Sequence, residues 1–411
     1  MKNQIISSRL RKFILSSCYN GAVLPAAPAP SCWKTLRDCG TALWLDTGDA
    51  DAAAGLWCED FSALTTNNTL LNREIQKGLY DGLIQTMAGI VLDEDPACSG
   101  KLLVRTVALA LNAIHGLNLS RRFGAAVSVE LHTDLAFDWE RSYNVGCQLW
   151  SLCPERFFIK VPFTAAGLLA ARRLQRDGVP VNFTLGFSAR QNYLAARLAS
   201  PSFVNVFMGR LNAFVGDNGL GDGINVGEKV TLSSQREIAA LRRDKMTGSR
   251  QIGASMRDAG QVAALCGIDV MTMPPPVAAS FQAAPPAVLE DRTTEDPPVV
   301  CDRAFLARLW TVTPEFRRLV DGLLQLDVDR MMAEDIEHYF RRHGEGGLFP
   351  EWIPEEVGIM LDDGKIPVFD NWAHHLEYGD IGPDALMSMS ALYSFIADQR
   401  ALDSRIRSIL D

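Results

Sequence analysis

The chain has 411 residues, a formal net charge of −9, an apolar fraction of 47% and a charged fraction of 22%. This length accommodates one large barrel domain of about 250 residues together with a substantial appendage. The negative charge argues against nucleic acid as the main partner, because a phosphate backbone binds a basic surface, but it does not exclude a small phosphorylated ligand. The composition is that of an ordinary soluble globular protein.

The nine cysteines form no Cys-x-x-Cys pair, and the six histidines form no His-Glu-x-x-His arrangement. This spacing indicates reduced thiols, with neither a disulfide framework nor a metal site. The apolar run at residues 13–15 is too short for a signal-peptide core, and no stretch reaches the roughly 18 consecutive apolar residues of a membrane span. We therefore expect a cytoplasmic protein that binds no membrane.

Short apolar runs alternate with helical patterns between residues 41 and 285. Eight runs predict strands, at 41–47, 62–66, 126–131, 157–162, 181–187, 203–209, 251–256 and 269–274. Helical periods predict helices at 165–176, 189–198 and 259–266, and two or three more within 69–118. Apolar strands interleaved with helices predict a parallel sheet covered on both faces. Eight such units favour an α/β fold of the (β/α)8 TIM-barrel type.

The remaining segments predict additions to this barrel. We expect an N-terminal extension at 1–30, the barrel at 31–282, a mostly helical insertion at 283–384 and a closing helix at 385–411. The insertion begins with a Pro-rich and acidic linker and continues with helices predicted at 303–310, 314–326 and 330–342. It could be a lid over the barrel mouth, an interface in a possible homodimer or a stabilising appendage. We favour the last two, since its sequence shows no chemistry.

Lys160 lies in the mostly apolar run Arg-Phe-Phe-Ile-Lys-Val-Pro at 156–162. Burying a lysine is costly unless its amine is paired or neutral. Desolvation lowers the pKa of a lysine, which gives a free amine able to attack a carbonyl. Taken alone, this residue fits a strand-end lysine whose ammonium reaches solvent slightly better than it fits a buried, reactive amine. The motifs around it reverse that preference.

Eight motifs occur along the chain in a defined order. They are Leu-Asp-Thr-Gly-Asp at 45–49, Thr-Thr-Asn at 65–67, Val-Ser-Val-Glu at 127–130, Phe-Ile-Lys-Val-Pro at 158–162, Asn-Phe-Thr-Leu-Gly-Phe-Ser at 182–188, Phe-Met-Gly-Arg at 207–210, Gly-Ala-Ser-Met-Arg at 253–257 and a closing-helix pattern at 395–410. Together they resemble the transaldolases, Schiff-base enzymes that need no cofactor and move a dihydroxyacetone unit between sugars. Residues 1–30 and about 283–384 lie outside the resemblance.

The resemblance implies four catalytic residues. Lys160 would form an iminium with the substrate ketone, and Asp46 would take the proton of the hydroxyl that becomes an aldehyde. Glu130 and Thr184 would hold the water that exchanges protons with the imine. Because Glu130 is a carboxylate in an apolar strand, a raised pKa is expected, which suits a proton shuttle. The alternatives are an ion pair with Lys160 for Glu130 and a plain core position for Thr184.

The resemblance also implies a clamp for a substrate phosphate, formed by Arg210, Arg257 and Ser255. A guanidinium presents a planar fork of donors that suits phosphate oxygens, and surface ion pairs are the alternative for both arginines. Further substrate-binding side chains would come from Asn67, Asn182 and Asn205.

Three positions depart from the family pattern. Phe163 follows the lysine strand where a small residue is common, and a core position and a narrower pocket mouth are the two explanations. Asn68 stands where the family usually has proline, which predicts a looser backbone beside Asn67, and Asn205 stands where many members have serine. These changes put the sugar specificity in doubt and leave the Schiff-base chemistry intact.

We expect a transaldolase that acts on small-molecule sugar phosphates in the pentose phosphate pathway. An aldolase that releases the three-carbon ketone, a transaldolase of a specialised pathway and a non-catalytic sugar-phosphate-binding barrel are the alternatives. The last would lack the lysine or its proton-handling partners. A metal-dependent aldolase is disfavoured because the histidines do not cluster.

Overall fold

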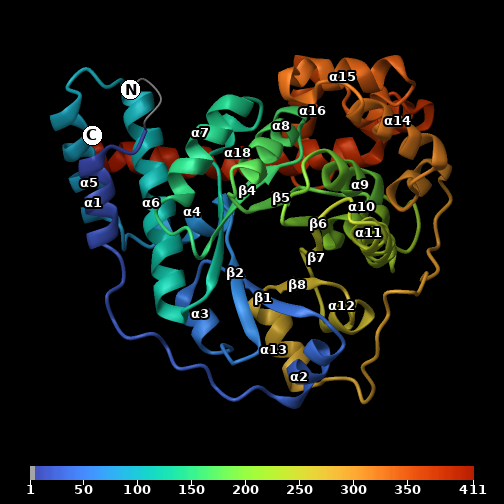
Figure 1. Ribbon diagram of the computed structural model, residues 1–411, viewed down its shortest axis with the longest axis horizontal. Coiled ribbons are helices and arrows are strands. Elements are labelled where there is room, and N and C mark those ends of the chain that lie inside the picture. Colours follow the sequence, from blue (N-terminus) through green and yellow to red (C-terminus); the bar gives the residue numbers. More distant parts are fainter. Residues whose placement is uncertain (1–4) are drawn as a thin grey trace.

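The computed structural model describes residues 5–411, and a closed barrel of eight parallel strands lies at its centre (Figure 1). The strands are β1 Ala42–Asp46, β2 Phe61–Thr65, β3 Ala126–Glu130, β4 Phe157–Pro162, β5 Val181–Thr184, β6 Phe203–Phe207, β7 Arg250–Ala254 and β8 Val270–Met273. Each strand pairs with the next along the chain, and β8 pairs with β1 to close the barrel. The predicted (β/α)8 TIM-barrel fold is therefore confirmed.

Helices connect the strands and cover the outside of the barrel (Figure 1). They are α2 Ser31–Asp38, α3 Ala50–Ala54, α4 Asn68–Gln76, α5 Asp81–Glu94, α6 Gly100–Phe123, η1 Thr133–Leu135, α7 Trp139–Trp150, α8 Ala165–Arg176, α9 Ala189–Leu198, α10 Met208–Asp217, α11 Val226–Arg243, α12 Ala259–Ala264 and α13 Pro275–Ala283. The bounds of α8 and α9 agree with the prediction because side-chain caps mark their starts. Thr164 accepts a hydrogen bond from the N–H of Gly167, and Ser188 accepts one from the N–H of Gln191.

Three strands, β5, β6 and β7, end two or three residues earlier than the sequence predicts. Residues Leu185 and Ser255, directly after β5 and β7, have φ angles of 63° and 61°. This left-handed backbone is uncommon outside glycine and turns the chain away from the sheet. After β6 the strand stops because helix α10 begins at once, at Met208. The polar residues that follow these strands are therefore directed over the barrel mouth, where active sites of this fold lie.

Aromatic rings fill the floor of the barrel. The rings of Trp44 and Phe158 stack with their centroids 5.7 Å apart, and Phe203 lies edge-on to both at 4.7 and 5.1 Å. Side chains of a strand alternate between its two faces, so positions two residues apart share the inner face. Two positions further along these strands stand Asp46, Lys160 and Asn205. The apolar floor thus supports a polar layer nearer the mouth.

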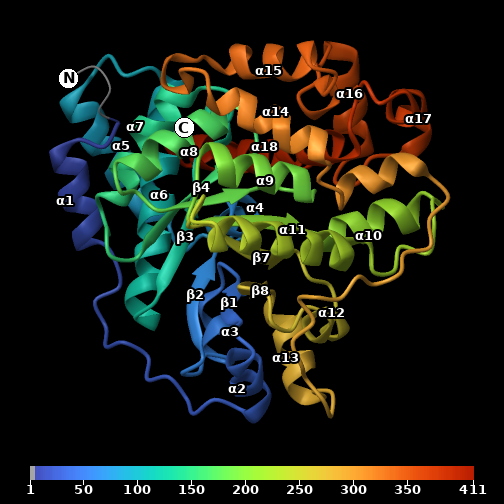
Figure 2. The same cartoon turned by 45° about the vertical axis from the view of Figure 1, so that its right-hand side comes forward.

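The insertion forms a helical layer beside α8 and α9 (Figure 2). Its elements are η2 Ala304–Leu309, α14 Pro314–Leu324, η3 Val328–Arg330, α15 Ala333–Arg342, η4 Gly346–Leu348, α16 Pro354–Asp363 and α17 Phe369–Tyr378. The first helical pattern corresponds to a 3-10 helix and the next two to α14 and α15. The sequence did not predict α16 and α17, which are only ten residues long each.

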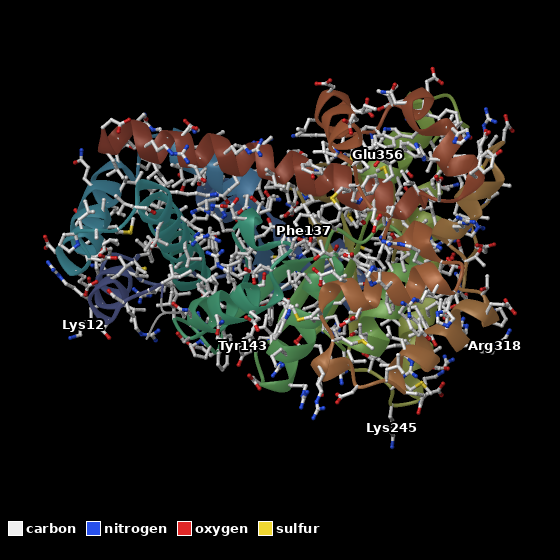
Figure 3. The ribbon with its side chains drawn as sticks, turned by 90° about the horizontal axis from the view of Figure 1, so that it is seen from above. Lys12, Phe137, Tyr143, Lys245, Arg318 and Glu356 are labelled. Atoms are coloured by element: carbon white, nitrogen blue, oxygen red, sulfur yellow. The ribbon has the colours of Figure 1, made fainter. Side chains whose placement is uncertain are left out.

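The closing helix α18, Pro383–Leu410, runs along the molecule from the insertion to the helices α5 and α6 (Figure 3). Its start is fixed by a buried ion pair between Asp384 and Arg190, whose nearest atoms are 2.7 Å apart. Near its end, Arg405 pairs with Asp81 on α5 at 2.6 Å. The helix therefore connects the insertion, the barrel and the N-terminal side.

The N-terminal helix α1, Ser8–Ser16, packs on α5 and α6. Residues 1–4 of the expected extension lie outside the described residues, and the division into domains stays a prediction. Within the described chain, α6 is the one helix long and apolar enough to cross a membrane by length and composition. The core helix of a soluble protein passes the same test, and 83% of its apolar window is buried inside the protein.

Candidate active site

A cavity of about 830 Å³ lies at the carboxyl ends of the strands and brings most of the predicted site together. Eight predicted residues line it, namely Asp46, Asn67, Lys160, Asn182, Asn205, Arg210, Ser255 and Arg257. The other two, Glu130 and Thr184, are buried on the strands next to Lys160 and are not among the lining residues. Among the described residues, no group of three or more His, Cys, Asp or Glu is placed to hold a metal ion.

Lys160 is buried, with 4% of its surface exposed. Its Nζ donates a hydrogen bond to the backbone oxygen of Thr66 at 3.1 Å. In the sheet register it stands between Glu130 on β3 and Asn182 on β5. The explanation by a solvent-exposed ammonium therefore does not hold. The amine lines the cavity, with apolar side chains below it and polar ones on both sides.

Asp46 ends β1 and faces the same cavity. Thr65 donates a hydrogen bond to its Oδ1 at 2.6 Å, and the hydroxyl of Thr65 also lies 2.7 Å from that of Thr272. Burial raises the pKa of Asp46, while the positive charge of Lys160 and the bond from Thr65 oppose the rise. A carboxylate with a raised pKa is a stronger base, which suits the removal of a hydroxyl proton.

Glu130 ends β3 at the register position opposite Lys160. Burial raises its pKa, as the sequence predicted, and the charge of Lys160 and a hydrogen bond from the backbone N–H of Asn68 oppose the rise. That N–H lies 3.1 Å from Oε2. Among the described ion pairs, none joins Glu130 to Lys160 within 4 Å. The arrangement suits proton exchange better than a closed salt bridge.

Thr184 ends β5 and is fully buried. Its Oγ1 has no hydrogen-bond partner among the described residues. A buried hydroxyl without a partner costs free energy, so a ligand or a water is the partner to expect. Its register partner is Pro162, two residues beyond Lys160 on β4. The hydroxyl is therefore near the lysine strand and free to bind a water there.

Three asparagines on the cavity wall have different partners. Asn205 Nδ2 donates to Asn182 Oδ1 at 3.0 Å, and Asn182 Nδ2 donates to Ser128 at 2.9 Å. The Oδ1 of Asn205 is buried without a partner among the described residues. Asn67 caps α4 by accepting the N–H of Leu70 at 2.8 Å, which leaves its amide nitrogen for a ligand.

Arg210 and Arg257 form a cationic end of the cavity. Arg210 is buried, and its Nη1 has no hydrogen-bond partner among the described residues. Burial and the charge of Arg257 lower the pKa of Arg210 to about 10, and Asp398 opposes this. The guanidinium lies 5.6 Å from the ring centroid of Phe395 on α18. Within the described chain neither arginine has an ion pair within 4 Å, so both charges are available to an anion.

Gly209 allows the start of α10 to approach the loop after β7 closely at the cationic end of the cavity. A Cβ on Gly209 would lie 2.2 Å from the backbone oxygen of Ser255 and 2.7 Å from the side chain of Arg257. Any larger residue would push the start of α10 away from the loop after β7. Arg210 and Ser255 therefore meet because residue 209 has no side chain.

A family model described as transaldolase/fructose-6-phosphate aldolase matches residues 43–337, which include strands β2 to β8 and all of β1 except Ala42. The chain belongs to this family. The resemblance inferred from the motifs is thus confirmed, and the protein is an enzyme of the transaldolase type. The expectation that the resemblance stops near residue 283 is wrong, because the family match continues through the first part of the insertion to residue 337.

Three bacterial transaldolases illustrate the similarity. The transaldolase of Allorhizobium ampelinum is 27% identical over 313 residues, which cover 72% of this chain and 92% of that protein. That of Methylobacillus flagellatus is 26% identical over 305 residues, covering 72% and 94%. That of Shewanella baltica is 29% identical over 243 residues, covering 57% and 74%.

Sequence reasoning missed several side chains at this family site. Thr65 donates a hydrogen bond to Asp46, and its hydroxyl lies next to that of Thr272. The motif Thr-Thr-Asn at 65–67 contains Thr65, so the sequence offered a signal for this residue. Phe395 belongs to the closing helix, and the guanidinium of Arg210 lies over its ring. Lys365, from the insertion, also lines the cavity. No motif includes Lys365, so its place in the site depends wholly on the fold.

Proposed function

We propose that the protein is a transaldolase that transfers a dihydroxyacetone unit through a Schiff base on Lys160. The donor would be fructose 6-phosphate or sedoheptulose 7-phosphate, and the acceptor erythrose 4-phosphate or glyceraldehyde 3-phosphate. The observation that supports this most directly is the buried amine of Lys160 in one cavity with Asp46 and two unpaired arginines. A cytoplasmic location and a role in the non-oxidative pentose phosphate pathway are part of the proposal.

The reaction begins when the neutral amine of Lys160 adds to the ketone carbon to give a carbinolamine. Glu130, through a bound water, donates a proton to the carbinolamine hydroxyl, which leaves as water, and the nitrogen keeps its remaining proton as an iminium. Asp46 removes the proton of the hydroxyl on the carbon that becomes the aldehyde. The electrons of the broken carbon–carbon bond then move into the iminium and form an enamine. The aldose phosphate leaves, and the enamine carbon attacks the aldehyde of the acceptor. Asp46 returns its proton to the new alkoxide, and water releases the product ketose.

Glu130 and Thr184 serve the steps in which water enters and leaves. Thr184 Oγ1, which has no partner among the described residues, binds the water beside the lysine strand. Glu130 exchanges protons with this water, and the rise of its pKa on burial favours the protonated form that can return a proton. The N–H of Asn68 keeps the carboxylate oriented.

The rest of the cavity fixes the length and pose of the substrate. Arg210 and Arg257, with Ser255, bind the phosphate at one end. The unpaired Oδ1 of Asn205 and the free amide nitrogen of Asn67 lie on the walls and hydrogen-bond the hydroxyls of the three-carbon unit. Water exclusion by the aromatic floor protects the enamine from protonation from below.

The nearest alternative is an aldolase that protonates the enamine and releases dihydroxyacetone. The name of the matched family covers both reactions. The two differ in the fate of one intermediate, so free dihydroxyacetone formed from fructose 6-phosphate without an acceptor separates them. Transfer that requires an aldose phosphate supports the transaldolase.

The deciding experiment is borohydride reduction with fructose 6-phosphate, followed by intact mass and peptide mapping. A three-carbon adduct on Lys160 is expected, because cleavage precedes trapping. The variant Lys160→Met should give no adduct. Lys12, an exposed lysine at one end of the molecule (Figure 3), does not line the cavity, so Lys12→Met should label like the wild type. A six-carbon adduct would point to another preferred sugar. No adduct with any ketose in a folded protein would overturn the proposal.

A further inference from the structure

The helical insertion contributes one residue, Lys365, to the lining of the active-site cavity. This lysine lies in the segment 364–368 between α16 and α17. The match to the family model ends at residue 337, so the segment is not part of the matched region. An insertion that reaches the cavity can act on the substrate directly.

The segment is attached to the helix that carries Arg210. Asn218, at the end of α10, donates from Nδ2 to the backbone oxygen of Pro367 at 2.9 Å. Its Oδ1 accepts the N–H of Phe369 at 2.8 Å. Since α16 also packs on α18, which carries Phe395, the segment lies between the two helices that build the cationic end of the cavity. Lys365 therefore lines the same cavity as Arg210 from a segment that is anchored at the end of α10.

The turn before Lys365 has a fixed shape. Gly364 has φ 80° and ψ −131°, a backbone conformation that side chains disfavour. The carboxylate of Asp363 accepts the N–H of Val368 at 3.0 Å and the indole N–H of Trp372 at 2.8 Å. These bonds close the loop across residues 364–367, so Lys365 is presented from an ordered turn.

The ionisable side chains that line the cavity are mostly basic. They are one acid, Asp46, and five bases, Arg73, Lys160, Arg210, Arg257 and Lys365. The whole chain, by contrast, has a net charge of −9. Among the described residues, Lys365 has no hydrogen bond or ion pair, and its side chain is exposed. Its ammonium is thus available at the mouth of a cavity that already contains two unpaired guanidinium groups.

We propose that Lys365 is a specificity-determining residue that binds the substrate phosphate together with Arg210 and Arg257. The inference rests on the proposed function in taking a phosphorylated sugar as the ligand. A phosphate monoester carries close to two negative charges at neutral pH. A lysine acts on it as a mobile point charge, whereas the two arginines bind in a fixed geometry. The insertion therefore increases the preference for phosphorylated over unphosphorylated sugars.

The test compares Lys365→Ala with the wild type and with Lys12→Ala, which removes the same charge from an exposed position that does not line the cavity. The KM for fructose 6-phosphate should rise roughly three- to tenfold in Lys365→Ala, the range of one exposed or partly exposed contact to an ionised group. The kcat should change much less, and turnover of unphosphorylated fructose should keep its KM. Lys365→Arg should restore much of the affinity.

Binding of inorganic phosphate gives a readout that does not depend on turnover. The Kd for inorganic phosphate, obtained from the rise of the melting temperature with phosphate concentration, should increase by the same factor in Lys365→Ala and stay unchanged in Lys12→Ala. Gly364→Ala, which alters the turn and keeps the lysine, should also weaken phosphate binding.

The two proposals can fail separately. If no sugar phosphate is turned over or trapped, the proposed function fails while the phosphate titration still tests Lys365. Equal phosphate affinity in wild type and Lys365→Ala would overturn the inference even in an active transaldolase. A rise in KM that is equal for fructose and its 6-phosphate would also overturn it, because it would show a general effect on the cavity.

Discussion

The backbone N–H of Asn68 donates a hydrogen bond to Oε2 of Glu130 over 3.1 Å. Asn68 is the first residue of α4, at the position where the family usually has proline. Proline has no N–H and could not make this bond. The sequence predicts a looser backbone at this position, but both groups are buried, and the backbone N–H of the asparagine donates to the carboxylate that we propose as the proton shuttle. It therefore changes the electrostatics of the site.

The first prediction concerns the variant Asn68→Pro. The backbone can accept it, since proline is favoured at the first helical position and Asn67 has the extended φ and ψ of −154° and 175° that precede a proline. A hydrogen bond to a carboxylate lowers its pKa, so the loss of this bond should raise the pKa of Glu130 above its already raised value. The limb of the pH–rate profile that belongs to Glu130 should move to higher pH.

The matched control is Asn68→Ala, which loses the side chain and keeps the N–H. Its profile should stay close to that of the wild type, and Glu130→Gln should remove the limb altogether. Equal profiles for the proline and alanine variants would show that the N–H does not set the pKa of Glu130.

The second prediction contrasts two buried arginines. Arg210 has no ion pair among the described residues, whereas Arg190 is paired with Asp384. Arg210→Leu should lower kcat/KM for fructose 6-phosphate at least about 100-fold, the value of one or two charge-assisted bonds to phosphate. The melting temperature of Arg210→Leu should stay the same or rise, because burying an unpaired charge destabilises the folded protein. Binding sites often contain residues that favour binding at the expense of stability.

Arg190→Leu leaves Asp384 buried without its partner and should destabilise the protein by about 3–5 kcal/mol. Thermal unfolding and steady-state kinetics on both variants measure these effects. Equal destabilisation by the two substitutions would mean that Arg210 is a structural residue rather than an anion ligand.

The third prediction concerns Asn205, which stands where many family members have serine. Its Nδ2 donates a hydrogen bond to Asn182, and this bond fixes the orientation of its unpaired Oδ1 on the cavity wall. Asn205→Ser should remove a contact to the three-carbon unit that six- and seven-carbon ketose phosphates share, and so lower kcat/KM for both donors by roughly threefold or more, about the value of one neutral hydrogen bond. Measuring both donors with one acceptor tests this. An unchanged kcat/KM for both donors would show that residue 205 does not contact the donor hydroxyls.

The strands and the polar layer at the barrel mouth were predictable because their signals are local. Each strand is a short apolar run, and the candidate residues Asp46, Glu130 and Lys160 stand at or near strand ends, which this fold brings to one mouth. The position of Lys365 depends instead on Asn218, which is bonded to Pro367 across 149 residues of chain. The bond of Asn68 to Glu130 spans 62 residues. No local pattern contains such pairings, so these contributions became visible only in the structure.

The fourth prediction concerns the packing of α6 on the barrel. A Cβ on Gly116 would lie 2.5 Å from Cγ1 of Val129 and 3.2 Å from the ring of Phe157. Gly116→Ala should therefore destabilise the protein by about 1–3 kcal/mol despite the higher helix propensity of alanine, since overpacking a rigid core forces the backbone to shift. Because Val129 immediately precedes Glu130, the displacement should also lower the activity.

Gly89 on α5 is the matched control, because it is exposed and a Cβ there would meet no atom within 4 Å. Gly89→Ala should stabilise the protein by roughly 0.5–1 kcal/mol through helix propensity alone. Urea unfolding of both variants, read with the activity of each, separates the two effects. If Gly116→Ala is as stable and as active as Gly89→Ala, then α6 does not hold the Glu130 strand in place by close contact.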